Sequence, residues 1–172
     1  ARACYDEALA IFTIASDLVD QARVLNGLGT IAYAEGDVLK AKNYYERALS
    51  IAHRQEARQL YGRTLCGLGD VERTLLHYEE AGRYYGEALV IAKELDTPAE
   101  QSVVLRRMGE LAQVQGNYDA ALESWFQALN LDQRLEHPAR VELDARVKSF
   151  VAEHHLEAVY ASFCEQYEAH RV

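Results

Sequence analysis

The chain has 172 residues, of which 49% are hydrophobic and 26% charged, and its net charge is −9. These proportions are typical of a globular protein, and the acidic balance excludes the whole chain as a binder of nucleic acid or of an anionic membrane. The three cysteines, Cys4, Cys66 and Cys164, are too widely spaced for a disulfide framework or a zinc motif, and the longest N-terminal apolar run, residues 8–12, is too short for a signal peptide or a membrane span, so we expect a cytoplasmic protein.

The N-terminal segment introduces a pattern that returns every 40 residues. Leu9 is followed at that interval by Leu49, Leu89 and Leu129. A chain that repeats a supersecondary unit in this way folds as a stack in which each unit buries its apolar face on the next. Residues 1–16 match only the second half of a unit. We therefore expect them to form the second helix of a truncated preceding repeat, with an uncovered apolar face through which copies of the chain could self-associate.

Residues 17–56 contain the first full unit. Leu25, Leu28 and Ala32 recur at helical spacing and predict the buried stripe of a first helix. Gly36 and Asp37 then predict a turn, and a second helix follows. Residues 57–96 and 97–136 repeat this order as the second and third units. The positions that recur are Gly29, Gly69 and Gly109; Ala41, Ala81 and Ala121; Tyr45, Tyr85 and Trp125; and Ala48, Ala88 and Ala128.

The small residues of this pattern predict positions of close helix packing. Glycine inside a helix costs roughly 0.5–1 kcal/mol relative to alanine, so its recurrence at one spacing indicates that two helices approach closely there. We expect the large aromatic residues to fill the gap between successive units. Thr97, Pro98 and Glu100 have the form of a helix start, with Thr97 as the capping residue.

Residues 137–172 keep a helical apolar pattern but lose the repeated glycine, because Ser149 stands in its place. We interpret this segment as a degenerate fourth helix pair that caps the stack, since solenoids need a polar end for solubility.

The spacing of glycine, alanine, aromatic residue and alanine resembles the tetratricopeptide-repeat family. In the first unit the alanines lie 12 and 19 positions after Gly29, with Tyr45 between them. HEAT and armadillo repeats have a comparable period but a different pattern. The usual tetratricopeptide repeat has about 34 residues, so the units here resemble the long-helix variant of the family. The resemblance implies an all-α fold, a right-handed α-solenoid of antiparallel helix pairs (a tetratricopeptide-like superhelix).

In that family the first helix of each pair lines the concave groove, and this points to candidate binding residues. Positions i, i+3, i+7 and i+10 share a helix face. They are Arg23, Asn26, Thr30 and Tyr33; Arg63, Cys66, Asp70 and Arg73; and Val103, Arg106, Glu110 and Gln113. Four arginines against two carboxylates favour an acidic protein or peptide partner. In the alternative interpretation the arginines pair with Asp70, Glu110 and their neighbours and attract nothing.

The sequence offers no catalytic residue, cofactor site or metal site, so we expect no enzyme. Gly27-Leu28-Gly29 lacks the third glycine of a dinucleotide-binding motif. His154 and His155 are adjacent and cannot chelate one ion together, so we expect them at the solvated surface. The carboxylate clamp of chaperone-binding family members is matched only by Arg107, because Gly67 and Val103 occupy two of its positions. We therefore expect no binding of chaperone tails.

The style of the repeat also resembles the C-terminal sensor arrays of bacterial STAND-type signal-transduction ATPases. Residues 48–52 and 88–92, with Gly-Asp or Gly-Asn turns at the same period, carry this resemblance. It implies a non-catalytic module that binds a protein, a peptide or a small-molecule inducer in its groove, within a larger regulatory protein. The alternative is a constitutive peptide-binding scaffold similar to the long-repeat adaptors of cell-polarity proteins.

Overall fold

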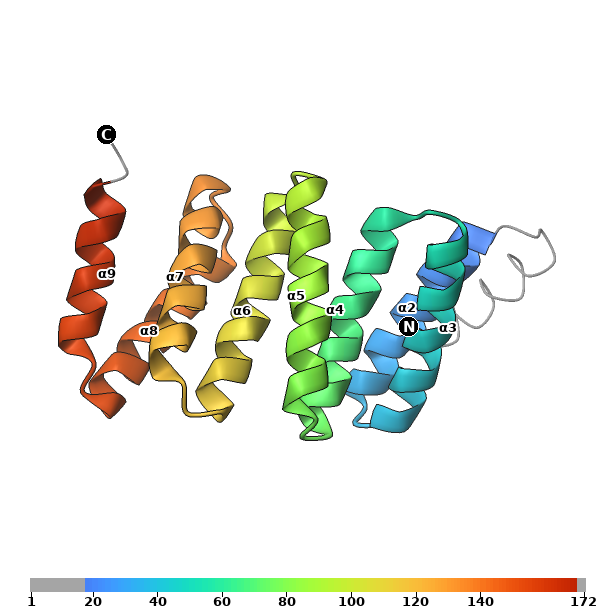
Figure 1. Ribbon diagram of the computed structural model, residues 1–172, viewed down its shortest axis with the longest axis horizontal. Coiled ribbons are helices and arrows are strands. Elements are labelled where there is room, and N and C mark those ends of the chain that lie inside the picture. The colour runs from blue at the N-terminus through green and yellow to red at the C-terminus, as the bar shows by residue number, and fades with distance from the viewer. Residues whose placement is uncertain (1–17, 170–172) are drawn as a thin grey trace. The chain divides into compact units, whose positions relative to one another are not determined.

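The computed structural model describes residues 18–169, with side chains as far as residue 165. This part of the chain is helical and contains no strand (Figure 1). Its helices are α2 (Leu18–Ala34), α3 (Val38–Arg54), α4 (Arg58–Thr74), α5 (Tyr78–Glu94), α6 (Pro98–Val114), α7 (Tyr118–Arg134), α8 (Ala139–His154) and α9 (Glu157–Ala169). The predicted all-α solenoid of antiparallel helix pairs is confirmed. The predicted N-terminal helix, and the self-association expected of it, lie outside the described residues.

The helices fall into two compact units, residues 1–96 and residues 97–172. In unit 1, α2 packs on α3 and α4 packs on α5, while α3 packs on α4 and joins the two pairs. In unit 2, α6 packs on α7, and both α8 and α9 contact α7. The described helices lie within the predicted segments 17–56, 57–96, 97–136 and 137–172, whose assignment as separate repeats stays a prediction.

Each 40-residue period consists of two equal halves. Helices α2 to α7 have 17 residues each, or about 25 Å at about 1.5 Å per residue. Three residues link each helix to the next from α2 to α7, and four residues, 135–138, link α7 to α8. In all six linkers the second residue has a positive φ. The residue after it donates a hydrogen bond back into the helix, as Asp37 N does to Ala32 O over 2.9 Å. This is the left-handed helix ending that favours glycine.

Only two of these six linkers use glycine at the left-handed position. Gly36 and Gly116 occupy it at φ 82° and 74°, which confirms the turns predicted there. The remaining four linkers place Glu56, Leu76, Asp96 and Glu136 in the same conformation, which the sequence does not reveal. Thr97 precedes α6 and Pro98 is its first residue, as predicted, but the Thr97 side chain makes no capping hydrogen bond. Thr97 is therefore the N-cap residue of α6, as predicted, but the side-chain hydrogen bond of a capping box does not form.

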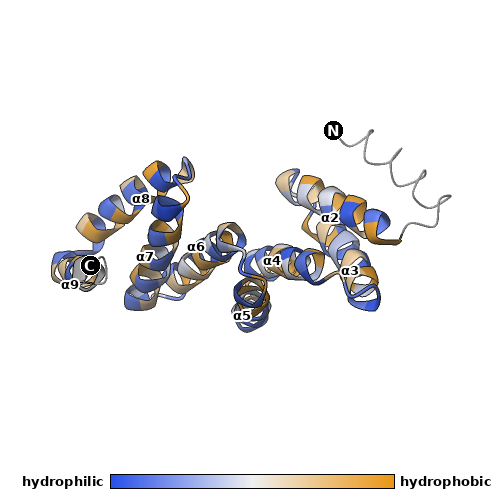
Figure 2. Ribbon diagram, turned by 90° about the horizontal axis from the view of Figure 1, so that it is seen from above, coloured by the Kyte–Doolittle hydropathy of each residue, from blue (hydrophilic) through white to orange (hydrophobic). Residues whose placement is uncertain are grey.

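The core follows the predicted apolar stripes. In α2, Leu25, Leu28 and Ala32 are buried, and Ala41, Tyr45 and Ala48 are buried in α3. Each labelled helix carries both hydrophilic and hydrophobic residues (Figure 2). The apolar stripe of one helix is thus buried against the other helix of its pair.

The repeated glycines receive the repeated aromatic rings. A Cβ placed on Gly29 would lie 2.7 Å from Cδ1 of Tyr45, and one on Gly69 would lie 2.6 Å from Cδ1 of Tyr85. Each ring therefore packs on the glycine of its own helix pair, a contact that the expected filling of the gap between units does not include. Tyr45 does both, since a Cβ on Gly67 in the next pair would also lie 2.6 Å from its Cζ.

The joint between the two pairs of unit 1 contains a buried ion pair. Glu72 on α4 is 3% exposed and lies 2.7 Å from Lys42 Nζ on α3, while its second oxygen lies 2.7 Å from Nδ1 of His77. Burial pushes the pKa of Glu72 up, but the hydrogen bonds from Lys42 and His77 outweigh this and leave the pKa below its usual 4.5. The carboxylate is charged and fully paired at neutral pH.

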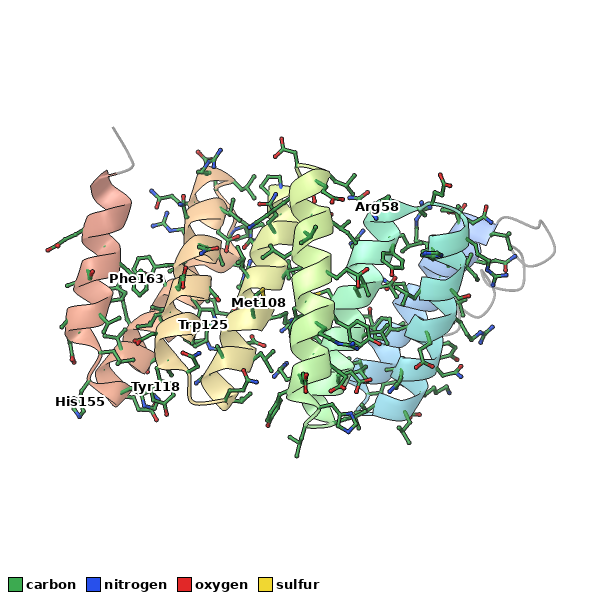
Figure 3. The ribbon with its side chains drawn as sticks, in the orientation of Figure 1. Arg58, Met108, Tyr118, Trp125, His155 and Phe163 are labelled. Carbon is green, nitrogen blue, oxygen red and sulfur yellow. The ribbon has the colours of Figure 1, made fainter. Side chains whose placement is uncertain are left out.

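Unit 2 keeps the glycine–aromatic contact in its first pair and loses it in the second. Trp125 is fully buried against Gly109, and Phe150 of α8 meets its ring edge-on at 5.1 Å. In the α8–α9 pair, Ser149 replaces the glycine and no aromatic ring is locked onto it. Helix α9 instead lays Phe163 on Phe126 of α7, with ring centroids 5.4 Å apart (Figure 3).

Candidate functional site

The first helices of unit 1 form a groove between α2 and α4. Its volume is about 470 Å³, and its walls are polar and apolar in equal measure. It is lined by Val19, Arg23, Asn26, Gly27, Thr30, Ile31, Ala57, Gln59, Leu60 and Arg63. Four of the predicted groove residues, Arg23, Asn26, Thr30 and Arg63, are therefore brought together at one place.

Two arginines line this groove, and they differ in whether the guanidinium group is already paired. The Arg23 side chain is 68% exposed and pairs with Asp20 one turn earlier. Arg63 is exposed and has no ion pair or hydrogen bond within the described part of the chain. An exposed ion pair is worth at most about 1 kcal/mol, so the Arg23–Asp20 contact is easily exchanged for another carboxylate. The groove thus offers positive charge within an acidic chain.

The floor of the groove is held by hydrogen bonds. Thr30 Oγ1 donates to Asn26 O over 3.1 Å and accepts from the Tyr45 hydroxyl over 3.2 Å. The Tyr45 ring reaches this point from α3 because glycines leave room for it at Gly29 and Gly67. Burial raises the pKa of Tyr45, so its hydroxyl remains a donor. The hydrogen bonds of Thr30 therefore fix this part of the groove before any ligand binds.

Further along α4, the predicted groove residues are engaged with one another. The Tyr85 hydroxyl donates to Asp70 Oδ1 over 2.7 Å, and Arg73 lies 3.9 Å from the same oxygen. Burial and the Asp70 charge raise the pKa of Tyr85 well above its usual value. Tyr33 donates to the Asp70 carbonyl oxygen over 3.3 Å. These residues form a cross-linked network rather than an open binding surface.

Cys66 was expected in the groove and is instead buried, with 9% of its surface exposed. Its position on α4 shares the helical spacing of Arg63 and Asp70, but the packing of neighbouring helices covers it. Cys66 is therefore a core residue, and its expected contact with a partner is corrected.

In unit 2 the positive charge of the predicted arginine stripe is neutralised by a carboxylate of the same unit. Arg106 Nη2 lies 3.1 Å from Asp132 Oδ2, and Asp132, only 1% exposed, also accepts from Ser102 Oγ over 2.5 Å. Arg106 therefore serves as the counterion of a buried carboxylate, which is the alternative interpretation of the arginine stripe. Sequence reasoning missed Asp132, although it stands where Ala52 and Ala92 occupy the same repeat position.

The next two residues of that stripe, Glu110 and Gln113, are hydrogen-bonded to α8. Arg146 Nη1 donates to Glu110 Oε1 over 2.9 Å, and its Nη2 donates to Gln113 Oε1 over 3.0 Å. The same guanidinium lies 5.1 Å from the centroid of the Trp125 ring. A cation over an indole face is attracted by the ring. Glu110 and Gln113 thus anchor α8 through Arg146.

The described residues show no arrangement suited to metal binding, since no group of three or more His, Cys, Asp or Glu side chains converges among them. His155 is exposed, as expected. His154 differs from the expectation: it packs 4.3 Å from the Tyr118 ring and 4.4 Å from the Phe150 ring. His154 is a packing residue rather than a solvated one.

Three antiparallel helix pairs of equal length, α2–α3, α4–α5 and α6–α7, each with an aromatic ring packed on a glycine, define a helix-hairpin repeat protein. The chain belongs to the tetratricopeptide-repeat family. The family model for the tetratricopeptide repeat matches residues 1–52 and 20–94, which together are more than half of the chain. Proteins of this family are generally non-catalytic scaffolds that bind protein partners.

A solved structure shares the fold. The crystal structure of BtubC (BKLC) from P. vanneervenii superimposes with a TM-score of 0.74 at 19% sequence identity, covering 89% of this chain. The chain spans 64% of the length of that protein. A search of curated proteins finds no match. Within residues 18–169, none of the helices is long and apolar enough to cross a membrane.

Proposed function

We propose that the chain is a non-catalytic interaction module that holds an extended, acidic segment of a partner protein in the groove between α2 and α4. The observation that carries this proposal is a groove of about 470 Å³ whose lining includes Arg23 and Arg63. Guanidinium groups donate paired hydrogen bonds to carboxylates, which makes arginine the preferred residue for recognising them. An acidic segment is thus the partner chemistry that this groove favours.

The contrast between the two units supports a binding site in unit 1. Arg106 and Arg146 of unit 2 already hold the carboxylates of Asp132 and Glu110. An external carboxylate would have to displace these, and taking the cation away from the buried Asp132 is strongly unfavourable. Among the residues that the structure describes, Arg63 has no internal carboxylate to displace.

The module would act within a larger regulatory protein. The repeat style of residues 48–52 and 88–92 supports a sensor array similar to those of STAND-type ATPases, with a peptide or a small-molecule inducer as the signal. A constitutive scaffold is the alternative. A thermal-shift screen separates the two, since a ligand that binds only the folded chain raises its melting temperature. Stabilisation by a small molecule favours the sensor, and stabilisation by peptides alone favours the scaffold.

A nuclear magnetic resonance titration tests the groove directly. The probes are three acetylated, amidated decapeptides in which serine alternates with glutamate, glutamine or lysine. We expect the glutamate peptide to shift amide signals of α2 and α4 and to bind more weakly as salt rises, because exposed charges are screened. The glutamine peptide should bind less well and the lysine peptide not at all.

Charge reversal supplies the matched control. Arg63→Glu should abolish the shifts, whereas Arg83→Glu, the same change at an exposed position on α5 outside the groove lining, should leave them unchanged. Equal binding by the Arg63→Glu variant, or signal changes confined to other helices, would contradict the proposed groove.

A further inference from the structure

A buried hydroxyl lies behind the groove at a position where the repeat otherwise has valine. Thr64 of α4 is 0% exposed, and the residues 40 positions before and after it are Val24 and Val104, which are also buried. A buried hydroxyl without a hydrogen bond is costly, so its presence in an apolar position calls for a partner. Thr64 has two acceptors that share its single hydroxyl hydrogen: Asn26 Oδ1 at 3.0 Å and the Leu60 carbonyl oxygen at 2.8 Å.

The bond to Asn26 joins a residue that lines the groove to a residue of the core on the neighbouring helix. Asn26 belongs to α2 and lines the groove, whereas Thr64 belongs to α4 and lies in the core. The position of Asn26 differs in every unit, since Cys66 and Arg106 occupy it in the next two. The one hydroxyl that replaces a buried valine is thus bonded to a side chain that the repeat does not fix.

This bond fixes the direction of the Asn26 carboxamide. With Oδ1 held by the Thr64 hydroxyl, Nδ2 is the end of the amide that is left for another partner. Nδ2 makes no hydrogen bond to any residue that the structure describes. An amide group carries two N–H donors that seek acceptors. At the groove wall these donors stand beside the guanidinium of Arg63, which is also a donor only.

We propose that Thr64 is a positioning residue that turns the Asn26 amide into the groove, where it donates a hydrogen bond to a main-chain carbonyl of the bound segment while Arg63 takes a neighbouring acidic side chain. The inference rests on the proposed function of the groove. A wall of donors selects an extended segment, because only an extended backbone presents free carbonyl oxygens between its side chains. Thr64 itself never touches the ligand.

The orienting role can be measured without a ligand. In the wild-type protein, side-chain ¹⁵N relaxation of Asn26 should report a restricted amide, and Thr64→Val should release it. Valine is the residue that the repeat carries at Val24 and Val104, so the variant is expected to fold. Thr64→Ser keeps the hydroxyl and should keep the amide restricted. An Asn26 amide equally mobile in all three proteins would overturn the positioning role.

Binding of the serine–glutamate decapeptide tests the consequence. Thr64→Val should weaken binding by about three- to tenfold, the effect of one hydrogen bond, and Thr64→Ser should restore it. In an Asn26→Ala background, Thr64→Val should have no further effect, because the two residues act as one unit.

The outcomes separate the two levels of the proposal. If the wild-type protein gives no shifts with the peptide, the proposed groove function fails and this inference fails with it. If the wild-type protein binds and Thr64→Val binds equally well, only the inference fails. An additional loss from Thr64→Val in the Asn26→Ala background would show that the hydroxyl acts on the fold as a whole, which also overturns it.

Discussion

The glycine–aromatic contact predicts that a single methyl group at Gly69 destabilises unit 1. An alanine Cβ at this position would lie 2.6 Å from Cδ1 of Tyr85, closer than real Cβ contacts allow. The ring cannot retreat easily, because Tyr85 is 0% exposed and its hydroxyl is bonded to Asp70 over 2.7 Å. Gly69→Ala must therefore displace α5 from α4 or break that hydrogen bond.

The expected magnitude is a balance of opposing effects. Alanine is preferred over glycine in a helix interior by about 1 kcal/mol, which alone would stabilise α4. Overpacking of a filled core costs about 1–3 kcal/mol, and loss of the Tyr85–Asp70 hydrogen bond costs about 1 kcal/mol more. The sum is a net destabilisation of about 1–3 kcal/mol.

Gly86→Ala is the matched control, since Gly86 lies inside α5 with nothing within 4 Å of the position of its Cβ. Here only the helix preference acts, and we expect stabilisation of up to about 1 kcal/mol. Both variants are compared by urea unfolding followed with circular dichroism. Opposite signs support the reasoning; a Gly69→Ala protein as stable as the Gly86→Ala protein would refute it.

Three further predictions concern buried polar groups. Arg106→Gln leaves the Asp132 carboxylate buried without its cation and should lower the free energy of unfolding by about 3 kcal/mol. The double variant with Asp132→Ala should recover most of this loss, and a double variant that stays as unstable as Arg106→Gln would count against the pair. Because the pKa of Glu72 lies below 4.5 in the folded chain, its contribution to stability is complete above pH 4.5 and lost as the pH falls through the lowered pKa; melting temperatures should therefore drop less in acid for Glu72→Gln than for the wild type. Because the pKa of Tyr85 is raised above 10, the folded chain retains a proton that the unfolded chain releases, so stability should decline above pH 10, and Tyr85→Phe should lessen the decline in alkaline melting curves.

The helix pairs are predictable from the sequence because they repeat. Positions such as Leu25 and Leu28 recur at helical spacing, and the family's pattern then orders the helices. The turns are predictable only where glycine marks them. Leu76 adopts a left-handed conformation at φ 65° although no glycine or asparagine marks the position in the sequence.

The candidate site is only partly predictable, because helical spacing gives the direction of a side chain and not its partners. Arg63 on α4 and Arg106 on α6 occupy the first and second positions of corresponding predicted stripes. Arg63 lines an open groove, whereas Arg106 is the counterion of Asp132, a residue 26 positions away on another helix. Periodicity along one helix carries no information about such a contact, so the choice between a free and a paired arginine required the structure.

Comparison across the 40-residue period does identify where the chain departs from simple packing. Four buried positions carry a polar side chain where the other units have none: Thr64 replaces valine, Glu72 and Asp132 replace alanine, and Ser102 stands where the other units have Ala22 and Gly62. Since a buried polar group costs free energy unless it is paired, each departure predicts a specific partner. Glu72 and Asp132 find cations and join helices. Thr64 finds a neutral amide on the groove wall. Thr64 is thus the buried polar residue whose partner lines the groove. For that reason its hydroxyl, rather than either buried carboxylate, is the place to test how the groove recognises a partner.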